Sequence, residues 1–132
     1  MKIRNFEAPD YQTIAKWWMQ SGEPAPAETL LLETKTFVVE VDARPVVAVT
    51  IYLGDSPWFG VVEDLIADPA LSPDRRREAI LLLWDFVQGL FRALKYKRVF
   101  CFTKHERLVT RYLEAYGWEQ SATGVTSLVK FL

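Results

Sequence analysis

Hydrophobic and polar residues alternate with two different periods along this chain, and the change of period separates strands from helices. A period of two residues, reinforced by β-branched side chains, predicts six strands. They are Lys2–Phe6, Thr36–Val41, Val46–Leu53, Trp58–Ala67, Arg98–Thr103 and Val125–Phe131. A helical period predicts four helices, from Pro9 to Ser21, over Glu28–Glu33, from Pro73 to Leu94 and over Glu106–Tyr116.

Turn-forming and capping residues lie between these segments and support their limits. Asp42–Pro45 joins two apolar strands and predicts an antiparallel hairpin, and Gly54–Pro57 indicates a second turn. Ser72 and Pro73 fit the N-cap and the first position of the long helix. Gly117 fits the position that closes the last helix.

The order of the elements, β-α-α-β-β-β-α-β-α-β, places antiparallel strands first and strand–helix–strand units later. The long helix connects Trp58–Ala67 to Arg98–Thr103, and a crossover of this kind joins parallel strands. We therefore expect an α/β (α+β) fold, with a mixed central sheet of six to seven strands and helices on both faces. The chain has 132 residues and no linker-like tract, so residues 1–132 are expected to form a single domain.

The composition argues against several kinds of partner and site. The 16 basic and 17 acidic residues leave a formal net charge of −1, so we expect binding neither to nucleic acid nor to a membrane. No segment has the pattern of a signal peptide or a membrane span, which indicates a cytoplasmic protein. Cys101 is the only cysteine and His105 the only histidine, so neither an internal disulfide nor a metal site is expected.

Three segments, in this order along nearly the whole chain, are similar to segments of the GNAT family of N-acetyltransferases. Lys2–Arg4 followed by Pro9–Tyr11 resembles the family's opening strand and helix. Val62–Pro69 (VEDLIADP) resembles its fourth strand, which often ends in a V-x-P element. Tyr112–Trp118 (YLEAYGW) is similar to the Y-E-K-x-G-F end of its last helix. The resemblance implies a GNAT-like sheet and an acetyl-CoA-dependent N-acetyltransferase.

In such an enzyme the acetyl group passes from acetyl-CoA to an amine by direct attack, and the resemblance implies roles for the fourth strand. Glu63 would act as the general base on the amine, with a pKa raised by burial or by the neighbouring Asp64. Backbone N–H groups of the same strand, over Leu65, Ile66 and Ala67, would orient the thioester carbonyl and so bind the cofactor. The alternative is that Glu63 simply lies on the polar, outward face of the strand.

Family members follow this strand with R/Q-x-x-G-x-G/A, whose glycines let backbone N–H groups approach the cofactor pyrophosphate. Here Leu71–Leu81 contains no glycine, and aligning Arg76 with the first motif residue puts Ala79 at one of the small positions. Arg75, Arg76 and Arg77 would then hold the phosphates by charge, beside Ala79. The alternative is that the three arginines are simply solvated in the first helical turn. Three positive charges at a helix N-terminus are unfavourable, however, because they oppose the helix dipole, and a bound anion would relieve this cost.

The family's tyrosine, which protonates the departing thiolate, corresponds to Leu113 when counted back from Gly117. Tyr112 and Tyr116 lie on either side of this position and would have to supply the proton instead. The resemblance thus implies Glu63, Tyr112 and Tyr116 as the catalytic residues.

A second interpretation is a catalytically inactive GNAT-like binding or structural module, similar to proteins encoded by bacteriophages and located in the virion or the host cytoplasm. The missing glycines, the shifted tyrosine and the many tryptophans favour it. Trp58 and Phe59, beside Pro57, could line an acceptor pocket or form a contact patch for a protein partner. One of the adjacent Trp17 and Trp18 is expected to be partly exposed, because neighbouring helical residues cannot both face the core. The enzyme would instead act on an amine-bearing small molecule or protein.

Overall fold

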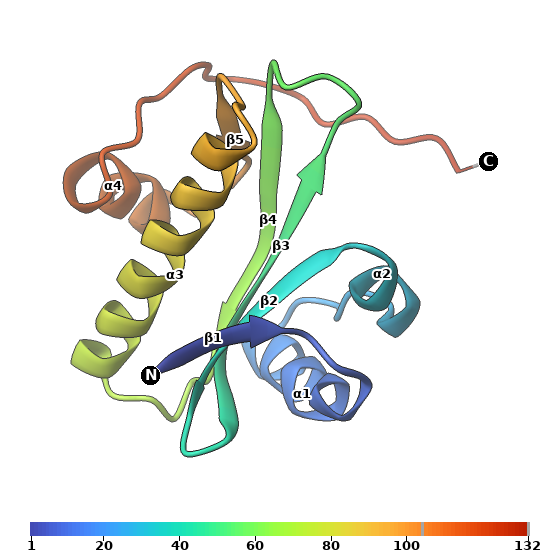
Figure 1. The fold of residues 1–132 in the computed structure, drawn as a ribbon, viewed down its shortest axis with the longest axis vertical. Coiled ribbons are helices and arrows are strands. Elements are labelled where there is room, and N and C mark those ends of the chain that lie inside the picture. Colours follow the sequence, from blue (N-terminus) through green and yellow to red (C-terminus); the bar gives the residue numbers. More distant parts are fainter. Residues whose placement is uncertain (104, 132) are drawn as a thin grey trace. The chain divides into compact units, whose positions relative to one another are not determined.

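The computed structural model describes residues 1–103 and 105–131 and divides into two compact units, Met1–Phe102 and Thr103–Leu132. Each unit is described here by itself, and the expectation that residues 1–132 form one domain stays a prediction. The first unit contains the sheet, whose strands are β1 (Lys2–Asn5), β2 (Lys35–Val41), β3 (Arg44–Leu53), β4 (Gly60–Ala67) and β5 (Val99–Cys101). They lie side by side in chain order (Figure 1).

The sheet is mixed, as the sequence predicts, because β1 to β4 pair antiparallel and only β4 and β5 pair parallel. Among the described residues it has five strands rather than six to seven. The expected strand Val125–Phe131 is wrong: none of these residues has strand structure and all are exposed, Leu128 to 90% and Phe131 to 91%. Their alternating pattern becomes a strand only where a partner strand supplies the backbone hydrogen bonds.

One face of the sheet is covered by α1 (Tyr11–Ser21), which follows a short 3₁₀ turn, η1 (Ala8–Asp10), and by α2 (Glu28–Glu33). The apolar side chains of these helices meet every second residue of the strands. The resulting buried cluster consists of Phe6, Ile14, Trp17, Leu31, Val38 and Ala48. Trp18 is only partly buried, which confirms that one of two adjacent helical tryptophans must turn outward.

The opposite face is covered by the long helix α3 (Pro73–Ala93), which begins after the N-cap Ser72 as expected. Phe37, adjacent to Val38 on β2 and therefore on the other face, contacts Phe86 of α3 edge-to-face, with ring centroids 4.9 Å apart. The residues that α3 buries are Ala79, Ile80, Leu83, Trp84, Val87 and Phe91. Helices thus lie on both faces of the sheet, in agreement with the expected fold class.

The strand β4 begins at Gly60, two residues later than the sequence predicts, and Phe91 of α3 lies directly over this position. A Cβ atom built on Gly60 would be 2.1 Å from Cε1 of Phe91. Trp58 and Phe59 fall in the preceding loop and are 68% and 55% exposed. Glycine at residue 60 is therefore a packing requirement rather than a turn signal.

The second unit contains α4 (Glu106–Ala115), and its helix ends where Gly117 has a φ of 71°, in the left-handed region. This confirms the expected closing role of Gly117. Around the helix end, Tyr112 packs against the rings of Tyr116 and Trp118, with centroids 5.6 and 5.7 Å apart. In neither unit does a described helix combine the length and the apolar character that crossing a membrane requires.

The turn between β2 and β3 is tighter than the expected Asp42–Pro45, since β3 already begins at Arg44. Its two central residues, Asp42 and Ala43, both have left-handed backbone angles, with φ of 50° and 61°. We expect Ala43→Gly to raise the free energy of unfolding by about 1 kcal/mol, because glycine has no Cβ to clash in this conformation. Urea denaturation measures the change.

The matched control for this prediction is Ala70→Gly. Ala70 is an exposed loop residue without a positive φ, so glycine there adds only unfolded-state entropy and is expected to lower stability slightly. Equal effects of the two substitutions would contradict strain at Ala43.

Candidate functional site

The parallel strands β4 and β5 pair only at their beginning. The register joins Gly60 to Val99, Val61 to Phe100 and Val62 to Cys101, where β5 ends. In contrast, β4 continues for five more residues, Glu63–Ala67, which β5 does not pair. Backbone N–H and C=O groups on this edge of β4 are therefore left without a strand partner within the unit that the structure describes as Met1–Phe102.

A β-bulge lies in β4 directly after the last pair with β5. Opposite it on β3, Ala48 faces Ile66 and Thr50 faces Glu63, so β4 carries one extra residue over this interval. Asp64, within the bulge, has a φ of 54°, which is uncommon for a residue other than glycine. A bulge bends the strand that carries it, so the extra residue bends β4 just beyond the point where its pairing with β5 ends.

Glu63 lies on the face of the sheet that α1 and α2 cover. It is the register partner of Thr50 on β3, and Thr50 shares its face with Ala48 of the buried α1 cluster. Thr50 is fully buried, and its hydroxyl lies 3.0 Å from the Thr36 hydroxyl on β2. The Glu63 side chain is thus next to a buried polar pair and is itself only partly exposed, rather than on an open outward face.

Three titratable side chains gather at this point. Burial, and then the charge of Asp64, raise the pKa of the Glu63 carboxyl above its ordinary value. Burial likewise raises the pKa of Asp64. Tyr52 on β3 has its pKa raised by burial, then by Asp64 and Glu63. Over residues 1–103 and 105–131, no group of three or more His, Cys, Asp or Glu side chains is arranged to hold a metal ion.

The cofactor-binding residues expected on β4 lie within the bulge, in the case of Leu65, or directly after it. Leu65, Ile66 and Ala67 are all half-buried, and Ile66 packs against the cluster beneath α1. Their backbone belongs to the stretch that β5 leaves unpaired. The structure therefore gathers Glu63 and these three residues along one strand edge, and their contact with a cofactor stays a prediction.

The loop between β4 and α3, Asp68–Ser72, is closed by Arg76. Its Nη2 atom donates to the carbonyl oxygens of Asp68, Pro69 and Leu71 at 3.5, 3.2 and 3.1 Å. Arg76 is half-buried, and it contacts the loop carbonyls through its Nη2 atom. The sequence predicts one role for Arg75, Arg76 and Arg77. In the structure, Arg76 contacts the loop, whereas Arg75 and Arg77 are exposed.

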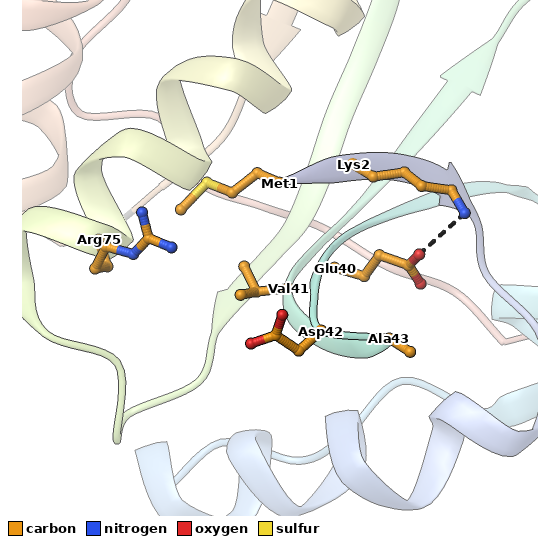
Figure 2. Close-up of a pocket in the computed structure, with 7 residues that line it drawn as sticks. All are labelled: Met1, Lys2, Glu40, Val41, Asp42, Ala43 and Arg75. Atoms are coloured by element: carbon orange, nitrogen blue, oxygen red, sulfur yellow. Dashed lines mark ion pairs between the residues drawn. The ribbon is translucent and has the colours of Figure 1, made fainter.

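Arg75 and Arg77 are both exposed, while Ala79 is fully buried against the sheet. The Arg75 side chain extends from α3 toward the β2–β3 turn (Figure 2). Its Nη1 donates to Glu78 Oε2 at 2.9 Å. It borders a hollow of about 390 Å³ lined by Met1, Lys2, Glu40, Val41, Asp42, Ala43 and Arg75. Glu78 brings a negative charge to the first turns of α3, and its ion pair with Arg75 partly compensates that charge.

A second hollow of about 780 Å³ shares part of the β2–β3 turn with the first. Its lining extends to α1 and to the β4–α3 loop, through Thr13, Val41, Asp42, Arg44, Pro45, Val46, Asp68 and Leu71. Neither hollow is lined by Glu63 or by the unpaired part of β4 before Asp68. The two hollows are thus separate from the stretch of β4 that β5 leaves unpaired.

The two tyrosines expected to act as acids lie in the second unit. Tyr112 is 5% exposed, and its ring packs with those of Tyr116 and Trp118. Leu113, at the position of the family's tyrosine, is 40% exposed. The catalytic roles of Tyr112 and Tyr116 stay predictions.

Sequence reasoning missed Tyr52 as part of the candidate site. The signal was present, because strand alternation puts Tyr52 on the same face as Thr50, two residues earlier. What the alternation could not give was the pairing register that brings Glu63 opposite Thr50.

A scan against models of known protein families finds no match, and neither does a search of curated proteins. Solved structures do match. Glucosamine-6-phosphate N-acetyltransferase from Arabidopsis thaliana is 12% identical, with a TM-score of 0.70 over 98% of both chains. An acetyltransferase from Trypanosoma brucei is 14% identical, with a TM-score of 0.66 over 97% of this chain and 99% of the other. Rv2747 from Mycobacterium tuberculosis, solved with CoA, is 19% identical, with a TM-score of 0.68 over 96% and 77%.

Proposed function

We propose that this chain, which has the fold of the GNAT-type N-acetyltransferases, transfers an acetyl group from acetyl-CoA to an amine. One observation carries the proposal. A half-buried carboxyl with a raised pKa, Glu63, lies on β4 at the point where β4 stops pairing with β5. A general base and unpaired backbone donors are thereby present on one strand, as acyl transfer from a thioester to an amine requires.

The residues present fit acetyl-CoA at two places. The unpaired edge of β4, over Leu65, Ile66 and Ala67, offers backbone groups to the thioester end. The exposed guanidinium groups of Arg75 and Arg77, in the first turns of α3, offer positive charge to the phosphates. This charge would replace backbone contacts, because Leu71–Leu81 has no glycine that lets N–H groups approach the phosphates. When bound, acetyl-CoA supplies the activated acetyl group.

In the proposed reaction Glu63 accepts the proton of the acceptor amine, which frees its lone pair for attack on the thioester carbonyl. The raised pKa suits this role because it brings the base closer to neutral pH. Donors on the unpaired edge of β4 orient that carbonyl. Tyr112 or Tyr116 supplies the proton that the departing thiolate takes up.

The acceptor is proposed to be an amine-bearing small molecule or protein. Glucosamine-6-phosphate is the substrate in the name of one structure with this fold, so amine acceptors are represented in the fold. The exposed Trp58 and Phe59, in the loop before β4, are the surface that we propose contacts a protein acceptor.

Binding of acetyl-CoA tests the proposal directly. By calorimetry, we expect micromolar binding, weakened about 5- to 10-fold by Arg75→Ala or Arg77→Ala because each removes a charge-assisted phosphate contact. Arg92→Ala is the matched control, since Arg92 lies in the last turn of the same helix. Absence of binding at millimolar acetyl-CoA would contradict the proposed enzymatic activity. The chain would then be a GNAT-fold module without this activity.

A further inference from the structure

The β4–α3 loop, Asp68–Ser72, uses its backbone carbonyls to bind an arginine of its own chain. Three of its carbonyl oxygens, at Asp68, Pro69 and Leu71, converge on the single Nη2 atom of Arg76 at 3.1–3.5 Å. Arginine suits this position because its planar guanidinium presents several donors in a fixed arrangement. One NH₂ group of the side chain therefore contacts three carbonyl groups of the loop.

The N–H groups of the same loop are also bonded within the chain. Asp68 N donates to the Val46 carbonyl at 2.8 Å, Ala70 N to the Asp68 carboxylate at 2.9 Å, and Leu71 N to the Asp68 carbonyl at 3.1 Å. Arg75 N donates to the Ser72 hydroxyl at 3.4 Å. A loop that binds phosphate through its backbone needs N–H groups directed at the ligand, and these three loop N–H groups and the Arg75 N–H of α3 are directed elsewhere.

We propose that Arg76 is a positioning residue that holds this loop closed, so that the phosphate end of acetyl-CoA is recognised by the side chains of Arg75 and Arg77 rather than by backbone N–H groups. This inference rests on the proposed function. Consecutive residues of α3 are rotated by about 100°, so the side chains on either side of Arg76 leave the helix in other directions. Both are exposed, whereas Arg76 is half-buried.

The salt bridge of Arg75 does not prevent this role. It joins Arg75 to Glu78, and the two side chains are 51% and 56% exposed. Exposed pairs of this kind are weak, so a phosphate group competes with Glu78 for the guanidinium. The half-buried Arg76 therefore sets the geometry of the loop, and the two exposed arginines supply charge.

The first experiment measures the loop itself. Amide hydrogen exchange of Asp68, Ala70 and Leu71 is compared in wild type, Arg76→Ala and Arg77→Ala. We expect at least about tenfold faster exchange in Arg76→Ala, because the loop loses three carbonyl contacts, and no change in Arg77→Ala. Arg76→Lys should recover part of the protection, since an ammonium reaches fewer carbonyls. Equal exchange in wild type and Arg76→Ala would overturn the positioning role.

The second experiment measures CoA affinity between low and high salt. A variant that loses a direct charge contact shows a weaker salt dependence, because screening then has less attraction to remove. We expect Arg77→Ala to flatten the salt dependence, and Arg76→Ala to weaken binding several-fold at every salt concentration with the wild-type slope. A flattened slope in Arg76→Ala would overturn the proposal by making Arg76 a direct ligand. If wild type binds no CoA, the proposed function fails together with the phosphate roles, while the exchange data still decide whether Arg76 holds the loop.

Discussion

Glu63→Gln is expected to lower kcat for acetyl transfer by about 10²- to 10⁴-fold, the range for loss of a general base. Glutamine keeps the shape of the side chain but cannot accept the amine proton. Release of CoA, followed with a thiol reagent on the acceptor that wild type turns over, measures the effect. Binding of acetyl-CoA should stay unchanged, because the phosphate contacts that we propose are on α3.

The pH dependence of the wild-type rate gives a second test of Glu63. The base is active as carboxylate, so the rate falls as pH falls through its pKa, and burial with the charge of Asp64 places that pKa above the ordinary value. Asp64→Asn removes the neighbouring charge and should move this acid limb to lower pH. Asparagine also tolerates the positive φ of residue 64.

The stability of Glu63→Gln separates catalysis from folding. A carboxyl whose pKa is raised in the folded protein binds protons more tightly there than in the unfolded chain. Its contribution to stability is therefore lost as pH rises from the unfolded to the folded pKa, and the ionised group is unfavourable at neutral pH. Glu63→Gln should thus be no less stable than wild type at pH 7. Retention of more than a third of the wild-type rate would contradict the base role.

Gly60→Ala is expected to lower the free energy of unfolding by about 1–3 kcal/mol, the cost of overpacking a filled core. The new Cβ would lie 2.1 and 2.6 Å from two ring atoms of Phe91, which is 2% exposed and cannot move into solvent. Denaturant unfolding at constant m-value measures the loss.

Two further variants identify the cause of this loss. Gly89→Ala, on the same helix as Phe91, meets nothing within 4 Å and should raise stability by about 1 kcal/mol through helix propensity. Phe91→Leu should restore part of the stability of Gly60→Ala by making room. Additive effects of residues 60 and 91 would disprove the clash.

Much of the fold could be predicted from local patterns. The β-branched runs located β2 and β3, and Ser72–Pro73 marked the start of α3 within a residue. These features depend on neighbouring residues alone, which is why sequence reasoning recovered them. The parallel pairing of β4 and β5 followed from the rule for helical crossovers, and the register confirms it.

The parts that could not be predicted depend on partners distant in sequence. The left-handed Asp64 has no local signal, because its bulge arises from pairing with β3. Arg76 reads like its neighbours in sequence, and only the path of the loop distinguishes it. Conversely, Val125–Phe131 carries a good strand pattern but pairs with nothing among the described residues.

The shortness of the β4–β5 ladder has a consequence for how the sheet withstands disturbance. Three residue pairs attach β5, whereas β3 pairs with β2 over residues 44–51 and with β4 over residues 47–53. Local opening therefore separates β5 from β4 at a lower free-energy cost than it separates the central strands. We expect such opening to be most frequent beside Glu63, where the pairing with β5 ends. A bulky molecule could enter there while the apolar interior stays dry.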